Sequence, residues 1–150
     1  MRMYAPSGAG DVHLVCFDRQ HRVALICPGG PDAGHPWMLP AVRRGKSELY
    51  RRAARRLACA MAPAGAIRLG AVTGRIRAAA PGTTPQRGGR RIFTSHVASP
   101  GALRGVGVPL VWLPYAQVAD LAEGLEVVDL GLFLEGYVDG WIPDGWITLQ

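Results

Sequence analysis

Short apolar runs separated by polar turns dominate the first part of the chain. Residues 12–17 (V-H-L-V-C-F) and 22–27 (R-V-A-L-I-C) are two such runs, and D-R-Q-H joins them. Runs of this length between polar residues are typical of β-strands, and the short connection favours a hairpin. The glycines and prolines of P-G-G-P-D-A-G-H-P then predict a loop that leads into W-M-L-P at 37–40.

The spacing of apolar residues changes to a helical period over 47–61. The apolar residues that share one face of this helix are Leu49, Ala53, Leu57, Ala60 and Met61. Ser47 is placed to cap the first turn, where the helix dipole favours the anionic Glu48. Pro63 and Gly65 end the pattern. We therefore expect an amphipathic helix that packs its apolar stripe on a sheet.

Strand and helix patterns continue to the C-terminal region. We expect strands at 67–77, 91–98 and 109–114, and helices at 115–121 and 127–138. A loop rich in Gly, Pro and Thr at 80–90 separates the first two of these strands. The element order ββ–β–α–ββ–β–α predicts a mixed sheet with helices on its faces. No repeat or linker divides the sequence, so we expect one domain over 1–150.

The charge is distributed unevenly along the chain, which carries a net charge of +6. Fourteen of the 17 basic residues lie within 43–104, where Glu48 is the only acidic residue. Six of the 11 acidic residues lie between Asp120 and Asp139. This polarity could steer anions, but the basic residues are spread over several elements without a row of aromatic residues. We therefore expect a solvated surface or internal ion pairs, and no nucleic-acid partner.

The composition favours a cytoplasmic protein. No apolar run has the length of a membrane span, and the N-terminal residues lack the apolar core of a signal peptide. The three cysteines, Cys16, Cys27 and Cys59, are odd in number and do not have the spacing of metal ligands. Reduced thiols in the cytoplasm are the simplest interpretation, and we expect no membrane partner.

The segment around the predicted helix carries W-M-L-P at 37–40, Glu48, and Ala53-Ala54-Arg55-Arg56, and V-W-L-P-Y-A-Q-V follows downstream. This arrangement resembles the Nudix hydrolase superfamily, whose signature is G-x5-E-x7-R-E-U-x-E-E-x-G-U with U bulky and apolar. An ungapped alignment places Glu48 on the first Glu and Arg56 on the Arg, and Ala53-Ala54-Arg55-Arg56 matches a common A-A-x-R. Downstream, V-W-L-P-Y-A-Q-V is similar to the strand and short helix of many members. The resemblance covers nearly the whole chain and implies a Nudix-like α/β/α sandwich with a mixed central sheet, an α/β (α+β) fold.

The sequence departs from this signature at the glutamates that bind divalent ions in the family. Leu57, Ala60 and Met61 stand at those positions, Val42 replaces the first Gly and Pro63 the closing Gly. Magnesium and manganese need hard oxygen ligands, which these side chains lack. A second alignment, on Gly45-Lys46, needs insertions and recovers no carboxylate. We therefore expect a degenerate box without a metal and no cofactor.

Candidate catalytic groups remain elsewhere: His96, His13, Asp129 and Glu135. Candidate substrate-binding residues are Trp37, Arg56 and the apolar trio Leu57, Ala60 and Met61. Each group has a structural alternative. The histidines could be ordinary strand residues (or, for His35, a loop residue), the carboxylates surface charges, the apolar residues core, and Arg56 the ion-pair partner of Glu48.

Three functional hypotheses follow from this pattern. The favoured one is a metal-independent enzyme that acts on a small organic molecule by acid/base chemistry: isomerisation, cyclisation, dehydration or hydrolysis in a specialised biosynthetic pathway. One alternative is a non-catalytic ligand-binding or regulatory module. The other is a nucleoside-diphosphate hydrolase with metal ligands recruited from 120–135. The apolar C-terminal helix and the tail with Trp141 and Trp146 fit either a homodimer interface or packing within one chain.

Overall fold

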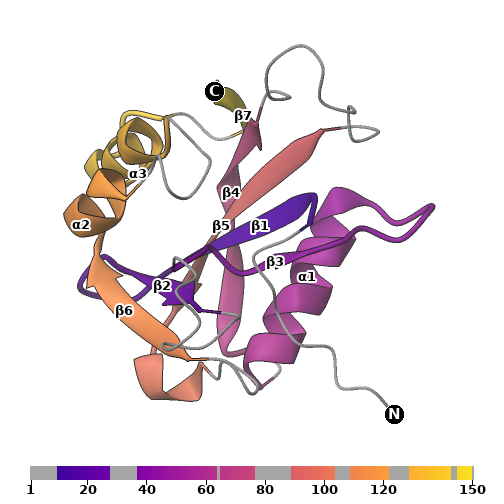
Figure 1. Cartoon of the computed structure of the whole chain (residues 1–150), viewed down its shortest axis with the longest axis horizontal. Coiled ribbons are helices and arrows are strands. Elements are labelled where there is room, and N and C mark those ends of the chain that lie inside the picture. The colour runs from indigo at the N-terminus through magenta and orange to yellow at the C-terminus, as the bar shows by residue number, and fades with distance from the viewer. Residues whose placement is uncertain are drawn as a thin grey trace.

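The computed structural model contains a central sheet with helices on both sides (Figure 1). It describes residues 10–27, 37–63, 65–76, 89–103, 109–121, 129–142 and 145–149. The elements in chain order are β1 (Val12–Phe17), β2 (Arg22–Ile26), β3 (Ala41–Val42), α1 (Tyr50–Met61), β4 (Ile67–Ile76), β5 (Arg90–Val97), a 3₁₀ turn (Pro100–Ala102), β6 (Leu110–Pro114), α2 (Tyr115–Asp120), α3 (Leu130–Asp139) and β7 (Gly145–Leu149). His35, Glu123, Glu126 and most of the loop predicted at 80–90 lie outside the described residues.

The sheet is mixed, as the element order predicts. Its strands follow the order β6-β2-β1-β5-β4-β7, and β3 pairs with β1 beside β2. The pairs β1–β5 and β4–β7 are parallel, and the other pairs are antiparallel. β1 and β2 form the predicted hairpin. No helix within the described parts of the chain has the length and apolar character needed to cross a bilayer.

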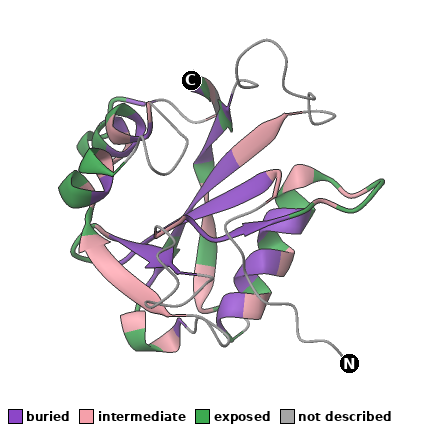
Figure 2. Cartoon of the chain, viewed as in Figure 1, coloured by how far each residue is buried: buried purple, intermediate pink, exposed green. Residues whose placement is uncertain are grey.

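Helices cover the two sides of the sheet and create two apolar cores. α1 packs on one side, here called the α1 face, and α2 and α3 pack on the other, the α3 face (Figure 1). Successive side chains of β1 alternate between them: Val15 and Phe17 join the core on the α3 face, and Leu14 and Cys16 the core on the α1 face. β1 is buried along its whole length (Figure 2). Burial on both sides explains its continuous apolar run.

Helix α1 begins later than the sequence predicts. Leu49, not Ser47, holds the N-cap position, and no side chain caps the helix there. The Glu48 N–H donates to the Gly45 carbonyl, and Glu48 Oε1 accepts from the Gly45 N–H. This turn keeps Glu48 ahead of the first helical turn. The expectation that Leu49 belongs to the apolar stripe is also wrong, because its side chain is 74% exposed.

The C-terminal region differs from the prediction in the start of helix α3 and in one additional strand. Helix α3 begins at Leu130 rather than at residue 127, and it ends where Gly140 adopts a φ of 77°, a left-handed conformation that favours glycine. The chain then forms β7, a strand that the sequence pattern does not predict. β7 extends the sheet by pairing in parallel with residues 72–76 of β4.

Candidate functional site

An ion pair between Glu48 and Arg56 connects the segment before α1 to the helix. Arg56 Nη2 lies 2.9 Å from Glu48 Oε1, and Arg56 Nε donates to Glu48 Oε2 at 3.1 Å. Arg56 Nη2 also donates to the Arg43 carbonyl at 2.8 Å. The hydrogen bonds from Arg56 and from the Gly45 N–H hold the pKa of Glu48 below its usual range. The pairing expected as an alternative role of Arg56 is thus confirmed, and its part in substrate binding stays a prediction.

The three box positions of α1 differ in burial but share one property. Leu57 and Met61 are fully buried in the core on the α1 face, and Ala60 is partly exposed. None of the three side chains offers an oxygen, so they do not fit a divalent ion with hard oxygen ligands. Within the described ranges, no group of three or more His, Cys, Asp and Glu residues is placed to hold a metal.

A cluster of three rings lies on the α3 face near the end of β5. His96 aligns with Phe17 of β1 in the parallel register, and its ring centroid lies 5.8 Å from that of Phe17. Tyr137 of α3 stacks on Phe17 at 5.1 Å, and its hydroxyl lies 2.5 Å from His96 Nε2. A Cβ added at Gly70 would come within 2.6 Å of Thr94 Oγ1 and 3.3 Å of the Tyr137 hydroxyl, so glycine at this position of β4 leaves room for both side chains.

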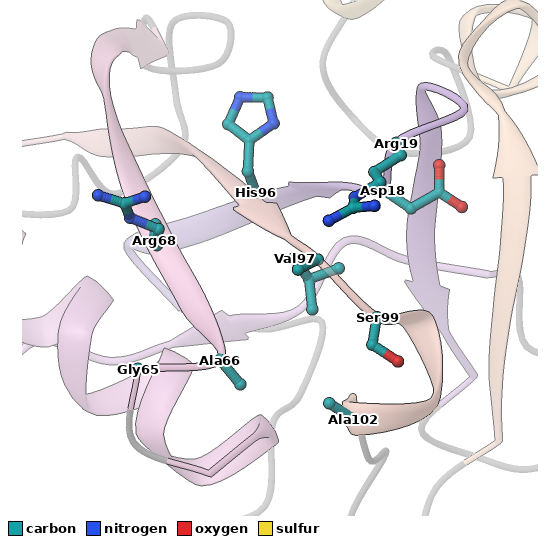
Figure 3. Close-up of a pocket in the computed structure, with 10 residues that line it drawn as sticks. Asp18, Arg19, Gly65, Ala66, Arg68, His96, Val97, Ser99 and Ala102 are labelled. Carbon is teal, nitrogen blue, oxygen red and sulfur yellow. The ribbon is translucent and has the colours of Figure 1, made fainter.

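His96 also lines a cavity of about 360 Å³. The other lining residues are Asp18, Arg19, Gly65, Ala66, Arg68, Val97, Ala98, Ser99 and Ala102. Figure 3 shows His96 between Arg68 of β4 and the turn after β1 that carries Asp18 and Arg19. The wall of the cavity therefore includes one histidine, one aspartate and two arginines, and its other residues have small side chains.

The protonation states in this cavity follow from the surroundings of each group. Packing against Phe17 and Tyr137 removes part of the hydration of His96, which lowers its pKa, and the charge of His21 lowers it further. His96 is therefore mainly neutral at pH 7 and can accept a proton. Burial favours the neutral form of Asp18, but hydrogen bonds from Arg22 and the Gln20 N–H outweigh it and lower the pKa.

Asp18 has a structural role in this turn. Its Oδ1 accepts from the N–H groups of Gln20 and Arg22, and its Oδ2 lies 2.6 Å from Arg22 Nε. In Figure 3 the Asp18 carboxylate points away from His96. The carboxylate thus fixes the hairpin that carries Arg19, and it is ionised and occupied by donors at neutral pH.

The other sequence-predicted residues lie apart from this cavity. His13 is 5% exposed on β1, and burial, with the charge of Arg90, lowers its pKa to about 4. Asp129 directly precedes α3, Glu135 is exposed on α3, and Trp37 packs against the core on the α3 face. Neither the His96 cavity nor a second cavity, on the α1 face, is lined by any of the other eight candidates. The roles assigned to these residues stay predictions.

A solved structure of a Nudix hydrolase from M. smegmatis, RenU, is similar to this chain. The sequences are 25% identical, the TM-score is 0.55, and the match covers 95% of this chain and 92% of RenU. The chain has a Nudix-like fold. The solution structure of the E. coli ORF135 protein is also similar, with 17% identity, a TM-score of 0.48 and coverage of 87% of this chain and 88% of that protein. No family model and no curated protein sequence matches the chain.

The sequence pattern did not single out Tyr137, or Arg19 and Arg68 of the cavity wall, as candidate groups. Tyr137 follows Phe133 and Leu134 by four and three positions, so all three side chains share one face of α3. This spacing predicts contact with the sheet, and a tyrosine hydroxyl near a sheet needs a hydrogen-bond partner. The helical period was therefore a usable signal for Tyr137. Its pairing with His96 depends on long-range packing that the sequence pattern does not specify.

Proposed function

We propose that this Nudix-like protein acts on a small organic molecule by acid/base chemistry, with His96 as the group that moves the proton. The contact between His96 Nε2 and the Tyr137 hydroxyl, beside a cavity of about 360 Å³, carries this proposal. A general base needs a neutral form at working pH, a fixed orientation and access to substrate. The lowered pKa of His96, its ring contacts and its place in the cavity wall meet these three requirements.

In the proposed mechanism, His96 Nε2–H donates to the Tyr137 hydroxyl oxygen. This tautomer leaves the lone pair of Nδ1 free to take a proton from a substrate C–H or O–H. The imidazolium then returns the proton to another substrate atom, so no net proton is consumed in an isomerisation or cyclisation. Arg19 and Arg68 also line the cavity, and in this mechanism they hold an anionic group of the substrate or of the intermediate.

The proposal includes a box that no longer holds a divalent ion. The apolar side chains of Leu57, Ala60 and Met61 support the loss of the metal site, because magnesium and manganese take oxygen ligands. Proton transfer by a neutral imidazole does not need an ion at α1. Isomerisation, cyclisation, dehydration and hydrolysis all suit such a group, and we place the substrate in a specialised biosynthetic pathway.

A proton-exchange screen tests the proposal across several classes of small molecule. Small carbonyl compounds and lactones are incubated with the protein in deuterated water containing EDTA, and exchange of acidic C–H positions is followed by NMR. We expect exchange in at least one compound class. His96→Gln should slow this exchange at least about 100-fold, because general-base catalysis contributes at least that factor.

Controls separate the proposal from its alternatives. Asp139→Asn, on the exposed side of α3, should leave exchange unchanged. A nucleoside-diphosphate panel with magnesium is run in parallel. Magnesium-dependent cleavage that EDTA abolishes would establish the hydrolase alternative instead. Binding of a compound without turnover, unaffected by His96→Gln, would favour a ligand-binding module and contradict the proposed chemistry.

A further inference from the structure

A second cavity, of about 350 Å³, lies on the α1 face and shares no residue with the His96 cavity. It opens between the start of α1, strands β4 and β5, and the first residue of β7. The residues that line it are Leu49, Tyr50, Arg51, Ala71, Thr73, Arg91, Phe93 and Gly145. Its volume lies near the lower end of the range for small-molecule sites, about 300–1,000 Å³.

Tyr50 forms a fixed aromatic wall of this cavity. Its hydroxyl donates to the Gly89 carbonyl at 3.1 Å. Two guanidinium groups lie over its ring, with the Arg44 and Arg91 Cζ atoms 4.1 Å and 4.7 Å from the ring centroid. Asp11 holds Arg44 through an ion pair at 3.6 Å. These cation–π contacts fix the plane of Tyr50 and position Arg91 beside the cavity.

The charged groups that line this cavity have one sign. Among the described residues of its wall, Arg51 and Arg91 carry guanidinium groups and no residue carries a carboxylate. Arg51 is exposed, and its Nη1 donates to the Gly70 carbonyl at 3.3 Å. A guanidinium has five N–H donors, so this bond still allows Arg51 to bind an oxyanion.

The rest of the wall is apolar or occupied by internal hydrogen bonds. Phe93 and Ala71 present carbon surface, and the Thr73 hydroxyl donates to the Gly145 carbonyl at 3.1 Å. Gly145 has a φ of 111°, which favours glycine, and apart from its chain neighbours no atom of the described residues lies within 4 Å of where its Cβ would be. The absence of this side chain keeps the β7 side of the cavity open.

We propose that this cavity binds a small organic oxyanion. Arg51 and Arg91 bind a carboxylate or phosphate group through charge-assisted hydrogen bonds. The apolar body of the ligand packs against Tyr50 and Phe93. The site is separate from the His96 cavity, so its ligand is a second molecule and not a part of the substrate bound there.

Four probe compounds test this proposal by NMR titration of the folded protein, with the amides of Gly70 and Gly145 as reporters. Benzoate and phenyl phosphate each combine an oxyanion with a flat ring, whereas benzyl alcohol lacks the charge and inorganic phosphate lacks the ring. We expect both ring-bearing anions to bind about tenfold or more tightly than benzyl alcohol, because charge-assisted hydrogen bonds contribute at least that factor. They should also bind about tenfold or more tightly than inorganic phosphate, because burial of the ring against Tyr50 and Phe93 contributes a similar factor. The tighter of the two identifies a carboxylate or a phosphate ester as the ligand class.

Variants on the exposed surface of α1 locate the binding. Arg51→Gln should weaken both anions about tenfold, and Arg51→Lys should restore part of the loss. Arg55→Gln removes an equal charge from an exposed position outside the cavity and should change neither affinity. An equal loss in Arg51→Gln and Arg55→Gln would overturn the proposal by revealing attraction to overall charge only. Equal binding of benzyl alcohol and benzoate would also overturn it.

Discussion

Helices cover both faces of the sheet, but the two faces carry different chemical groups. On the α1 face, helix α1 buries Leu57 and Met61 completely. The carboxylate of Glu48, just before this helix, forms an ion pair with Arg56. On the α3 face, β5 and α3 bring His96 and Tyr137 together beside a cavity. The contrast teaches that one sheet can bury apolar side chains under a helix on one face and hold an imidazole beside a cavity on the other.

The side chains on the two faces differ in whether they can carry a charge. Buried apolar side chains at the box positions need no partner, whereas a buried carboxylate is stable only when it is paired or bound to an ion. Glu48 is only partly buried, and hydrogen bonds from Arg56 and the Gly45 N–H lower its pKa. His96 keeps an exposed edge, so it can exchange protons with a ligand.

The largest expected effect comes from placing a carboxylate in the core of the α1 face. Met61→Glu should lower the free energy of unfolding by about 4 kcal/mol, because the buried charge would have no partner. Ala60→Glu is the matched control at a partly exposed position and should cost about 1 kcal/mol or less. Urea unfolding measures both. A stable Met61→Glu protein whose melting temperature rises with magnesium would reveal a surviving metal cavity on this face.

The next effect concerns His13, whose ring is buried in β1 and is influenced by the charges of Arg90 and Asp11. Its pKa is about 4 in the folded protein and 6.5 in the unfolded chain, so the unfolded chain binds more protons between these values. The free energy of unfolding should therefore fall as the pH drops from 6.5 to 4, by about 3 kcal/mol from this residue. Above about pH 7.5 the residue should contribute almost no pH dependence, because the imidazole is then neutral in both states.

His13→Leu isolates this contribution. Urea unfolding is measured at several pH values for both proteins, and the difference between their free energies of unfolding should change through this window. Carboxylates that titrate in both proteins cancel in that difference. A constant difference from pH 7 to pH 4 would contradict a neutral buried His13.

Much of the fold was predictable because its signals are local. The apolar runs of β1 and β2 and the helical period of α1 depend on residues close in sequence, and the ungapped spacing of Glu48 and Arg56 pointed to their ion pair. The start of α1 was wrong because the turn from Gly45 to Glu48 competes with helix formation. β7 was missed because a short strand after a Pro- and Gly-containing segment has little periodic signal.

The candidate site was predictable only in part. A histidine in a strand pattern identified His96, since imidazole chemistry needs no neighbouring motif in the sequence. The stacking of Phe17, His96 and Tyr137 joins β1, β5 and α3, which lie far apart in the sequence. Their proximity follows from the parallel pairing of β1 and β5 and the docking of α3, and neither is specified by local pattern.

A smaller effect is expected from the ion pair before α1. Glu48→Gln should lower the free energy of unfolding by about 1 kcal/mol, because the pair is partly exposed and water replaces some of its hydrogen bonds. Arg52→Gln, an exposed arginine of the same helix, should change stability by less than half of that. Chemical unfolding of Glu48→Gln, Arg56→Gln and the double variant should give a coupling energy between the two residues. Additive losses would mean that the contact contributes nothing to stability.

The smallest change in stability should come from the α3 face. Tyr137→Phe removes one hydroxyl beside a half-exposed histidine and should cost about 1 kcal/mol or less. The rate of proton exchange should nevertheless fall strongly in this variant, because the orientation of His96 would be lost. Thermal unfolding and the exchange assay on the same sample compare the two effects. A large loss of stability with unchanged exchange would assign Tyr137 to packing alone.

The most direct test of the account compares EDTA with His96→Gln in one assay on the compound that the wild-type protein turns over. If proton transfer occurs on the α3 face, EDTA should leave the rate unchanged and His96→Gln should reduce it at least about 100-fold with the fold intact. A rate that EDTA abolishes and His96→Gln preserves would place the chemistry on a metal ion and contradict the account.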